Sequence, residues 1–589
     1  MIHTARKMVA LLTPTQRKST LVLLALMVVG MILETFGLGL ILPAIALLME
    51  NDLGARYSWL APLLTALGNP TKPQLIIGGL AALVTIYLLK GLFLAFLAAR
   101  QMRFVFDVQA ELSLRLYDIY LHQPFTFHLN RNSALMIRNA GTEVVLFTFN
   151  CMMPSLTLLT EGLVVAGIAG LLLAVEPLGA ILVLMVLGVC AWGFQRATRR
   201  RIARWGEARL RHEGLRTQHL QQGLGGAKEV ILLGREEHFV EQYRVHNLQT
   251  ARMGQFQQSL QALPRLWLEV LAVTGLAILV LAMLAQGHAM DVIVQTVGLF
   301  AAAAFRLAPA ANRIINALQS LLYGVAVINT LYDEFCLPAP QQRRTTGNPI
   351  TFTRDIALSN VTYAYPGAET AAINDVSLAI KKGECVGFIG HSGSGKTTLV
   401  DVVLGLLEPT AGRVLVDGRD MYEDLRSWRI QIGYVPQAIY LVDSSLRANI
   451  AFGLPDSLID DAAVARAVRA AQLDEFIASL PDGLETVVGE RGVRISGGQR
   501  QRIGIARALY HDPAVVVLDE ATSSLDTATE HDVMQAVSVL RGNKTVIIVA
   551  HRLSTVEGCD RLYRLVEGRV FEEGSPAALL STRVSATTN

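Results

Sequence analysis

Apolar stretches long enough to cross a membrane fill most of the first 335 residues and restrict the fold more than any other feature. A membrane-spanning helix needs about 20 consecutive apolar residues. Only 17% of the residues are charged, against about 25% in an ordinary soluble domain. We therefore predict an all-α membrane domain over residues 1–336 with six helices, at about 20–49, 74–100, 143–174, 177–196, 264–286 and 290–323.

The positions of the cations predict the orientation of this domain. Lysines and arginines precede the first span, and "RATRRRIARWGEARLRHEGLR" follows the fourth, whereas the loops near Glu176 and Asp291 carry neither residue. Because cytoplasmic loops carry the excess of positive charge, we expect the N-terminus and the long loops in the cytoplasm. The segment "RYSWLAPLLTALGNP", with Tyr57 and Trp59, is expected on the outer side, either as a short interfacial helix or as a packed loop.

Charge and cysteine content exclude other classes of partner. The net charge is +3, and no polybasic arm lies outside the membrane flanks, so nucleic acid is not an expected partner. The cysteines are scattered and lack the paired spacing of metal ligands. We interpret all five as small packing residues, namely Cys151, Cys190, Cys336, Cys385 and Cys559.

A second domain, over residues 353–589, follows a linker at 337–352, "LPAPQQRRTTGNPITF". It alternates apolar strands and helices, and "CVGFIGHSGSGKTTLV" places a G-x-x-x-x-G-K-[ST] loop between a strand and a helix. This pattern predicts an α/β P-loop NTPase that binds ATP with Mg²⁺, in which Lys396 reaches the outer phosphates and Thr397 ligates the metal. The expected nucleotide-binding residues here are Gly390, His391, Ser392, Gly393, Ser394, Gly395, Lys396, Thr397 and Thr398.

Two further strands end in residues suited to phosphate chemistry. "AVVVLDEATSSLD" ends a strand in Asp519, a candidate for the magnesium site, followed by Glu520, a candidate general base for an attacking water. His551 follows the strand in "VIIVAHRLS" and is expected to orient the outermost phosphate. We therefore take Glu520 and His551 as the candidate catalytic residues.

The segment "RISGGQRQRIGIARAL" resembles the signature sequence of the ABC (ATP-binding cassette) ATPases, and the whole chain resembles an ABC half-transporter of the exporter type. The resemblance implies that Tyr365 stacks on adenine and that Gln437 senses magnesium and the γ-phosphate. It also implies that Glu490 lies in a loop facing the membrane domain and that residues 523–526 connect the two ATP sites.

The same resemblance implies a dimer, because the signature closes over ATP held by the other subunit. The signature residues are Ser496, Gly497, Gly498 and Gln499. Ile495 and Ser524 depart from the usual leucine and alanine without removing a functional group. Both sites are therefore expected to hydrolyse ATP, which favours a homodimer.

Polar helical patterns continue two of the spans, at residues 100–121 and 195–222. They predict long helices that project from the bilayer. The segments "LHQPFTFHLN" and "GLGGAKEVILLGREEHFVEQY" lie at the turns of these projections. They are candidates for contacts with the ATPase domain, and the alternative is that they are plain loops.

Cations within the spans bear on the substrate. Arg306 and Arg313 are seven residues apart, so they share one helix face, about 10 Å apart along the axis. Lys90 and Arg265 add two cations in the inner half, and a charge at the bilayer centre costs about 2.5 to 3.5 kcal/mol. Two interpretations stay open: a substrate cavity lined by Lys90, Arg265, Arg306 and Arg313, or a structural network of ion pairs with Glu34, Glu161 and Glu269.

The segments "ETFGLGLILPAIALL", "LPRLWLEV" and "AAFRLAPAANRIINALQSLLYG" are similar to those of flippases for lipid-linked oligosaccharides in bacterial N-glycosylation. This resemblance implies a multi-pass protein of the bacterial inner membrane that moves a polyprenyl-pyrophosphate oligosaccharide outward, with the basic residues attracting the anionic headgroup. The alternatives are an exporter of peptides, drugs or another lipid with the same motor, and an ATP-gated channel or receptor.

Overall fold

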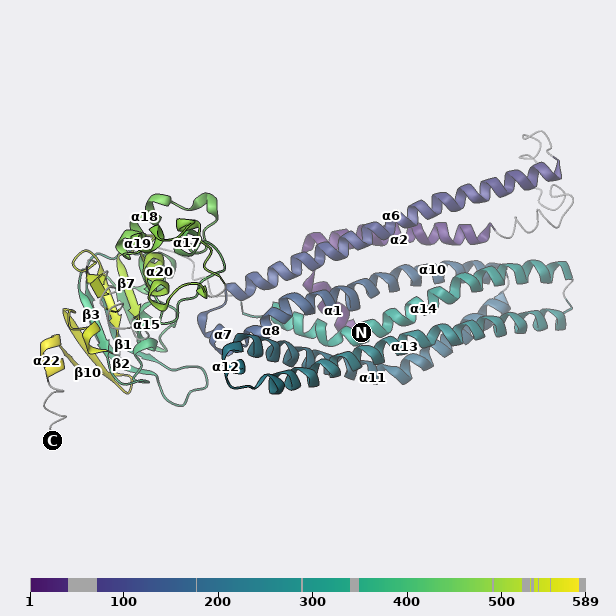
Figure 1. Cartoon of the computed structure of the whole chain (residues 1–589). Coiled ribbons are helices and arrows are strands. Elements are labelled where there is room, and N and C mark those ends of the chain that lie inside the picture. Colours follow the sequence, from purple (N-terminus) through teal and green to yellow (C-terminus); the bar gives the residue numbers. More distant parts are fainter. Residues whose placement is uncertain are drawn as a thin grey trace. The chain divides into compact units, whose positions relative to one another are not determined.

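The computed structural model describes residues 2–40, 71–175, 177–287, 290–338, 349–489, 492–521, 530, 534–535, 537–538, 540–550 and 552–581. The chain divides into two compact units (Figure 1). The first unit comprises Met1–Gln123 and Phe127–Pro340, and the second comprises Pro124–Thr126 and Gln341–Asn589.

The first unit is helical in its described part. Its elements are α1 (Ile2–Leu11), α2 (Pro14–Gly39), α6 (Lys72–Leu121), α7 (Phe125–Asn130), α8 (Ser133–Arg138), α9 (Val144–Phe147), α10 (Met153–Val175), α11 (Pro177–Gly225), α12 (Ala227–Leu232), α13 (Glu236–Ala285) and α14 (Met290–Phe335), with π-helical turns η1 (Asn139–Glu143) and η2 (Thr148–Met152).

Five of the described helices are long and apolar enough to cross a membrane, and each contains all or part of one predicted span. The remaining predicted span, 177–196, forms the first part of α11. Residues 41–49 of the first predicted span lie outside the described residues. The polar continuations are confirmed as helix, because α6 runs unbroken to Leu121 and α11 to Gly225. At 1.5 Å per residue such helices are about 75 Å long, which exceeds the roughly 30 Å of membrane hydrocarbon.

The helices approach one another most closely where glycines face other backbones. A Cβ atom on Gly206 of α11 would lie 2.2 Å from the carbonyl oxygen of Tyr323 in α14. A Cβ atom on Gly324 of α14 would lie 2.4 Å from the sulfur of Cys151 in η2. These two contacts bring α14 close to α11 and to η2. In addition, α14 packs against α10, and α2 packs against α6 and α10. Cys151 is fully buried, as expected of a packing residue.

The second unit is built on two sheets. The antiparallel sheet has the strand order β2-β1-β4-β5, and the other has the order β10-β9-β3-β8-β7-β6, in which β10 alone runs antiparallel to its neighbour. The strands are β1 (Asp355–Tyr363), β2 (Ile373–Lys381), β3 (Cys385–Ile389), β4 (Ala411–Val416), β5 (Arg419–Asp420), β6 (Ile432–Val435), β7 (Val515–Asp519), β8 (Thr545–Val549), β9 (Arg561–Val566) and β10 (Arg569–Gly574).

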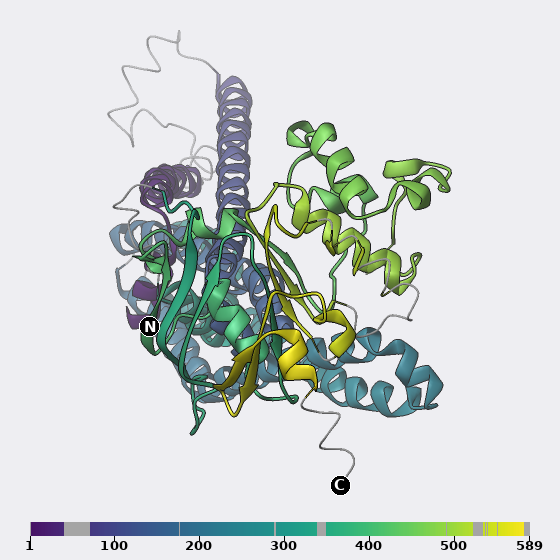
Figure 2. The ribbon, with the colours of Figure 1, turned by 90° about the vertical axis from the view of Figure 1, so that its left-hand side faces the viewer.

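Helices cover the six-stranded sheet on both faces. One apolar core joins the antiparallel sheet and α15 (Lys396–Val403) to residues of β3, β7, β8 and β9. A second core joins the opposite face to a helical group (Figure 2). That group comprises α17 (Leu446–Ile450), α18 (Asp461–Ala470), α19 (Asp474–Ala478) and α20 (Gly497–Leu509). The remaining helices of this unit are α16 (Leu425–Ile430) and α22 (Pro576–Ser581).

Candidate functional site

The phosphate loop connects the carboxyl end of β3 to α15. All five residues of β3 are buried, and the strand lies between β8 and β9 in parallel register. Gly390 and Gly395 have φ values of 155° and 99°. A Cβ atom on Gly390 would lie 2.4 Å from the Leu565 carbonyl oxygen, and one on Gly395 would lie 2.6 Å from that of Ala372. The loop therefore requires glycine at both positions, which leaves its backbone free to surround a phosphate.

Lys396 and Ser394 present polar groups within this loop. Lys396 Nζ donates hydrogen bonds to the carbonyl oxygens of Gly390, at 3.0 Å, and His391, at 2.9 Å. Burial lowers the pKa of Lys396, while Glu520 and Asp519 oppose that shift. Among the described residues, the buried hydroxyl of Ser394 has no hydrogen-bond partner. An ammonium group, an unpartnered hydroxyl and a helix N-terminus together suit a phosphate chain.

The predicted carboxylates lie at the carboxyl end of β7. Asp519 is buried, and Tyr434 of β6 donates to its Oδ2 atom at 3.4 Å. Glu520 has a φ of 49°, and its backbone N–H donates to the Val549 carbonyl oxygen at 3.0 Å. Gln437 Nε2 donates to Glu520 Oε2 at 2.7 Å. The fold thus brings Gln437 into contact with Glu520, and Asp519 directly precedes Glu520 at the end of β7. Mg²⁺ prefers carboxylate, amide and hydroxyl oxygens as ligands, and these residues supply such oxygens.

Asp401 belongs to this neighbourhood and was missed by the sequence analysis. It lies on α15, where burial and then the charge of Asp519 raise its pKa to about 6. A carboxylate four residues after Thr397 in an otherwise apolar helix was the signal available in the sequence.

Tyr365 lies beside the first turn of α15. Its hydroxyl is 3.1 Å from Thr398 Oγ1, and its ring packs edge-to-face on Tyr363 with centroids 5.1 Å apart. The ring is partly buried. This position at the phosphate loop is compatible with stacking on a nucleotide base.

The signature residues form the start of α20. Ser496 is the N-cap: its hydroxyl accepts from the Gln499 backbone N–H at 3.2 Å, and the Gln499 side chain accepts from the Ser496 N–H at 2.9 Å. Ser496 and Gly497 are exposed and Gly498 is buried. The helix N-terminus is therefore open to an anionic ligand from outside the chain.

Several predicted residues lie outside the described part of the structure. These are His551, Glu490, residues 523–526 and the segment containing Tyr57 and Trp59.

The membrane cations form one charge cluster that joins four helices. Lys90 Nζ lies 3.2 Å from Glu34 Oε2, and Arg306 bonds both oxygens of Glu34 at 3.3 Å. Glu161 bridges Arg306, at 3.5 Å, and Arg313, at 2.7 Å. The cluster of Lys90, Glu34, Arg306, Glu161 and Arg313 therefore connects α6, α2, α14 and α10.

Arg265 lies outside this cluster. It pairs with Glu269 on the same helix at 3.1 Å, and both side chains are largely exposed. Further along α14, Ser320 accepts from Gln261 Nε2 at 2.9 Å and Tyr323 is buried.

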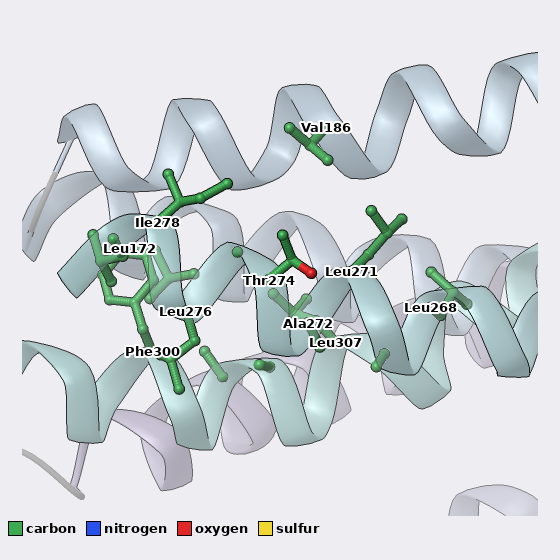
Figure 3. A pocket seen from close by; sticks show the side chains of 15 residues that line it. Leu172, Val186, Leu268, Leu271, Ala272, Thr274, Leu276, Ile278, Phe300 and Leu307 are labelled. Atoms are coloured by element: carbon green, nitrogen blue, oxygen red, sulfur yellow. The ribbon is translucent and has the colours of Figure 1, made fainter. Parts of the chain in front are cut away.

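An apolar cavity of about 70 Å³ lies between α10, α11, α13 and α14 (Figure 3). Leucine, isoleucine, valine, alanine and phenylalanine side chains supply most of its lining. The hydroxyl of Thr274, which also lines it, donates to the Val270 carbonyl oxygen of its own helix at 2.8 Å. The cavity therefore suits hydrocarbon.

Comparison with known proteins agrees with this geometry. Residues 373–523 match the family model of the ABC transporter. The chain is 34% identical over 492 residues to an ATP-dependent lipid A-core flippase of Cupriavidus metallidurans, with 80% of each protein covered. The chain belongs to the ABC transporter family. This transporter is also 32% identical over 529 residues to an ATP-dependent lipid A-core flippase of Chromobacterium violaceum, with 86% of each covered.

The fold of this ABC transporter is similar to that of a bacterial Atm1-family ABC exporter solved with ATP bound. The TM-score is 0.81 at 21% identity, and the match covers 97% of this chain and 98% of the other. The predicted fold class is confirmed: a helical membrane domain precedes a P-loop ABC ATPase domain. The protein is a multi-pass half-transporter that binds ATP and couples its hydrolysis to transport, and a half-transporter implies a dimer. Both relatives named above are lipid A-core flippases, not flippases of lipid-linked oligosaccharides.

Proposed function

We propose that this transporter is a homodimeric flippase of the bacterial inner membrane. In this proposal the N-terminus and the ATPase domain lie in the cytoplasm. Its substrate is a membrane lipid whose headgroup carries sugar and an anionic group such as a pyrophosphate. ATP drives the headgroup from the inner to the outer leaflet.

The charge cluster is the observation that carries the substrate class. Its three cations and two carboxylates leave one formal positive charge. An unneutralised charge within a membrane domain is costly, so it indicates a functional site or an anionic binding partner. The carboxylates are the more buried members, with side-chain exposures of 9% for Glu34 and 11% for Glu161. Arg313 retains 44% exposure. The carboxylates are thus covered and Arg313 is accessible, so an anion would approach the cluster at its exposed arginine.

The two arginines differ in their free donors. Arg306 directs Nε and Nη2 to Glu34 and Nη1 to Glu161. In the described part of the chain Arg313 uses only Nε, toward Glu161. We infer that Arg313 supplies the bidentate fork for a phosphate oxygen pair, while Arg306 and Lys90 contribute charge. Arg265 is the proposed entry cation at the inner leaflet.

The surroundings of Arg313 also suit the other parts of such a lipid. Among the described residues, the buried Oδ1 atoms of Asn312 and Asn316 have no hydrogen-bond donor, and sugar hydroxyls would supply one. On the same helix, Leu307 and Ala308 line the apolar cavity, which would take a segment of the hydrocarbon tail.

The proposed motor uses the predicted residues in the following roles. Lys396 and the loop hold the phosphates, Tyr365 stacks on adenine, and Thr397, Gln437 and Asp519 hold the metal. Mg²⁺ would neutralise charge on the phosphate oxygens when bound. Gln437 donates a hydrogen bond to Oε2 of Glu520, so its proposed role is also to orient the carboxylate that would deprotonate water. The proposed role of His551 is to orient the γ-phosphate.

The proposed second copy is identical to the first. Apolar side chains of α12 and its C-terminal end support this, because Ile231, Leu232 and Leu233 are 67%, 79% and 68% exposed. Such a patch on a cytoplasmic projection requires a partner. We propose that the ATPase domain of the second copy covers it, and that the exposed signature at Ser496 completes the ATP site of that copy.

Translocation in proteoliposomes tests the proposed substrate. A polyprenyl-pyrophosphate oligosaccharide and lipid A-core are offered separately, with ATP, to the intact dimer. We expect ATP-dependent movement of at least one of them, and we expect Arg313→Ala to reduce it by about tenfold, since one bidentate charged pair is worth roughly 1.5–3 kcal/mol. Arg103→Ala is the control, because Arg103 is an exposed residue of α6 whose ion-pair partner, within the described ranges, is Asp107 alone.

The outcomes separate the alternatives. Normal transport by Arg313→Ala would contradict the role of the charge cluster. Movement of peptides or drugs but of neither lipid would indicate the exporter alternative, and ATP-gated conductance without transport would indicate a channel.

A further inference from the structure

Two cysteines of the ATPase domain lie side by side although 174 residues separate them in sequence. The Sγ atoms of Cys385 and Cys559 are 3.3 Å apart, and both thiols are free. Cys385 is 1% exposed and Cys559 is 6% exposed. From the sequence both are expected to be packing residues, but packing alone does not require two thiols in hydrogen-bond contact.

The pair lies at the start of the strand that carries the phosphate loop. Cys385 is the first residue of β3, and Cys559 closely precedes β9, the neighbouring strand. Asp560 joins the two segments, because its backbone N–H donates to the Cys385 carbonyl oxygen at 2.8 Å and its Oδ2 accepts from the Cys385 N–H at 2.8 Å. The two backbone segments that carry the sulfur atoms are therefore already held together by hydrogen bonds. Forming a bond between the sulfurs requires little movement.

The environment favours ionisation of one thiol. The hydrogen bond with the Cys559 thiol lowers the pKa of Cys385, burial opposes this, and the Arg541 guanidinium lowers it further. The hydrogen bond with Cys385 and burial raise the pKa of Cys559, while Arg541 opposes that shift. Arg541 is held in place by a hydrogen bond of 2.6 Å from Nη1 to the Gly558 carbonyl oxygen. Cys385 is thus the nucleophile and Cys559 the resolving thiol.

We propose that Cys385 and Cys559 form a reversible dithiol–disulfide pair that pins the phosphate-loop strand to β9 when the cytoplasm becomes oxidising. Hydrogen peroxide is the oxidant. The Cys385 thiolate attacks one peroxide oxygen, giving a sulfenic acid and hydroxide, which takes up a proton to become water. The Cys559 thiol then displaces the sulfenic oxygen as a second water, so two electrons pass from the two sulfurs to peroxide. A reducing dithiol restores the pair by thiol–disulfide exchange.

The consequence is a more stable ATPase domain. A bond between residues so far apart in sequence restricts the unfolded chain more than the folded one. The phosphate loop lies at the other end of β3, so the pair touches neither Lys396 nor the carboxylates of the ATP site. This proposal is independent of the transported lipid.

Peptide mapping of the full-length protein tests the proposal. The background is Cys190→Ser with Cys336→Ser, which leaves the pair and the buried Cys151. After treatment with hydrogen peroxide we expect a Cys385–Cys559 disulfide peptide that dithiothreitol removes. We also expect the melting temperature of the ATPase domain to rise by several degrees, with no rise in the matched variant that also carries Cys559→Ser. Arg541→Gln should slow formation of the disulfide several-fold.

Two results would overturn the proposal. One is full alkylation of both cysteines after denaturation, at a peroxide concentration that oxidises the exposed Cys336 of the parent protein completely. The other is complete disulfide formation with an unchanged melting temperature. The peptide map of the parent protein decides the first point even if a serine variant fails to fold.

Discussion

The phosphate loop and signature of the ATPase domain position their polar side chains differently from the charge cluster of the membrane domain. In the ATPase domain, Lys396 bonds carbonyl oxygens five and six residues away, and Ser496 caps a helix through Gln499, three residues on. In the membrane domain, Arg306 bonds Glu34 across 272 residues and Arg313 bonds Glu161 across 152. The first kind of site is made by local motifs, and the second only by the packing of distant helices.

Because of this difference, removing a charged side chain should have different effects on activity and on stability in the two domains. Near the phosphate loop, water and the ligand share the site, so a removed carboxylate should affect chemistry more than folding. Inside the membrane domain, a removed carboxylate leaves cations without counter-charges in a medium that solvates them poorly.

The largest effect is expected for Glu520→Gln. Loss of a general base should reduce ATP hydrolysis by about 10²- to 10⁴-fold while ATP binding persists, because the phosphate loop is intact. Phosphate release and nucleotide binding are the measurements, with Glu557→Gln at an exposed position as the control. Near-normal hydrolysis would show that another group activates the water.

The next effect concerns the charge cluster. Glu34→Ala should destabilise the membrane domain by about 3 kcal/mol, because Lys90 and Arg306 lose a buried partner. Glu269→Ala removes an exposed partner of Arg265 and should cost at most about 1 kcal/mol. Thermal unfolding of the two variants in detergent measures both losses of stability. Equal losses of stability would mean that the cluster is not a buried network of ion pairs.

The last effect concerns pH. The pKa of Asp401 is raised from 3.8 to about 6. Its protonated form therefore stabilises the domain fully below about pH 4, and this contribution of about 3 kcal/mol is lost as the pH rises through 6. Asp401→Asn should raise the melting temperature at pH 8 and leave it nearly unchanged at pH 4. The exposed Asp482→Asn is the control, and a gain for Asp401→Asn that does not vary with pH would contradict this origin.

The sequence predicted much of the fold because each signal was local. Apolar stretches predicted the membrane helices, and the alternation around "CVGFIGHSGSGKTTLV" predicted the P-loop domain. The contact between Gln437 and Glu520, 83 residues apart, joins two residues that the sequence singled out separately, Gln437 through the family resemblance and Glu520 as a candidate general base. Asp401 was missed because nothing in the sequence shows that α15 brings it near Asp519.

The membrane cations show where prediction from sequence ended. Helical periodicity placed Arg306 and Arg313 on one face of α14, whereas Lys90 lies on α6 and Arg265 on α13. The sequence left both interpretations of these four cations open, substrate cavity and ion-pair network. Only the packing of α2, α6 and α10 on one side of α14 decided that Glu34 and Glu161 lie behind the arginines. Similarly, the five cysteines were equivalent in sequence, and only the pairing of β3 with β9 brought Cys385 to Cys559.

By itself, then, the sequence determined a membrane domain fused to an ATPase and predicted the residues that would hold ATP, because helix periodicity and phosphate-loop motifs depend on neighbours along the chain. Tertiary structure decided which charges pair with one another and, in the part of the chain that the structure describes, which arginine keeps unpaired donors. The physical reason is that electrostatic and thiol chemistry depends on distances of a few ångströms between segments that the chain places hundreds of residues apart.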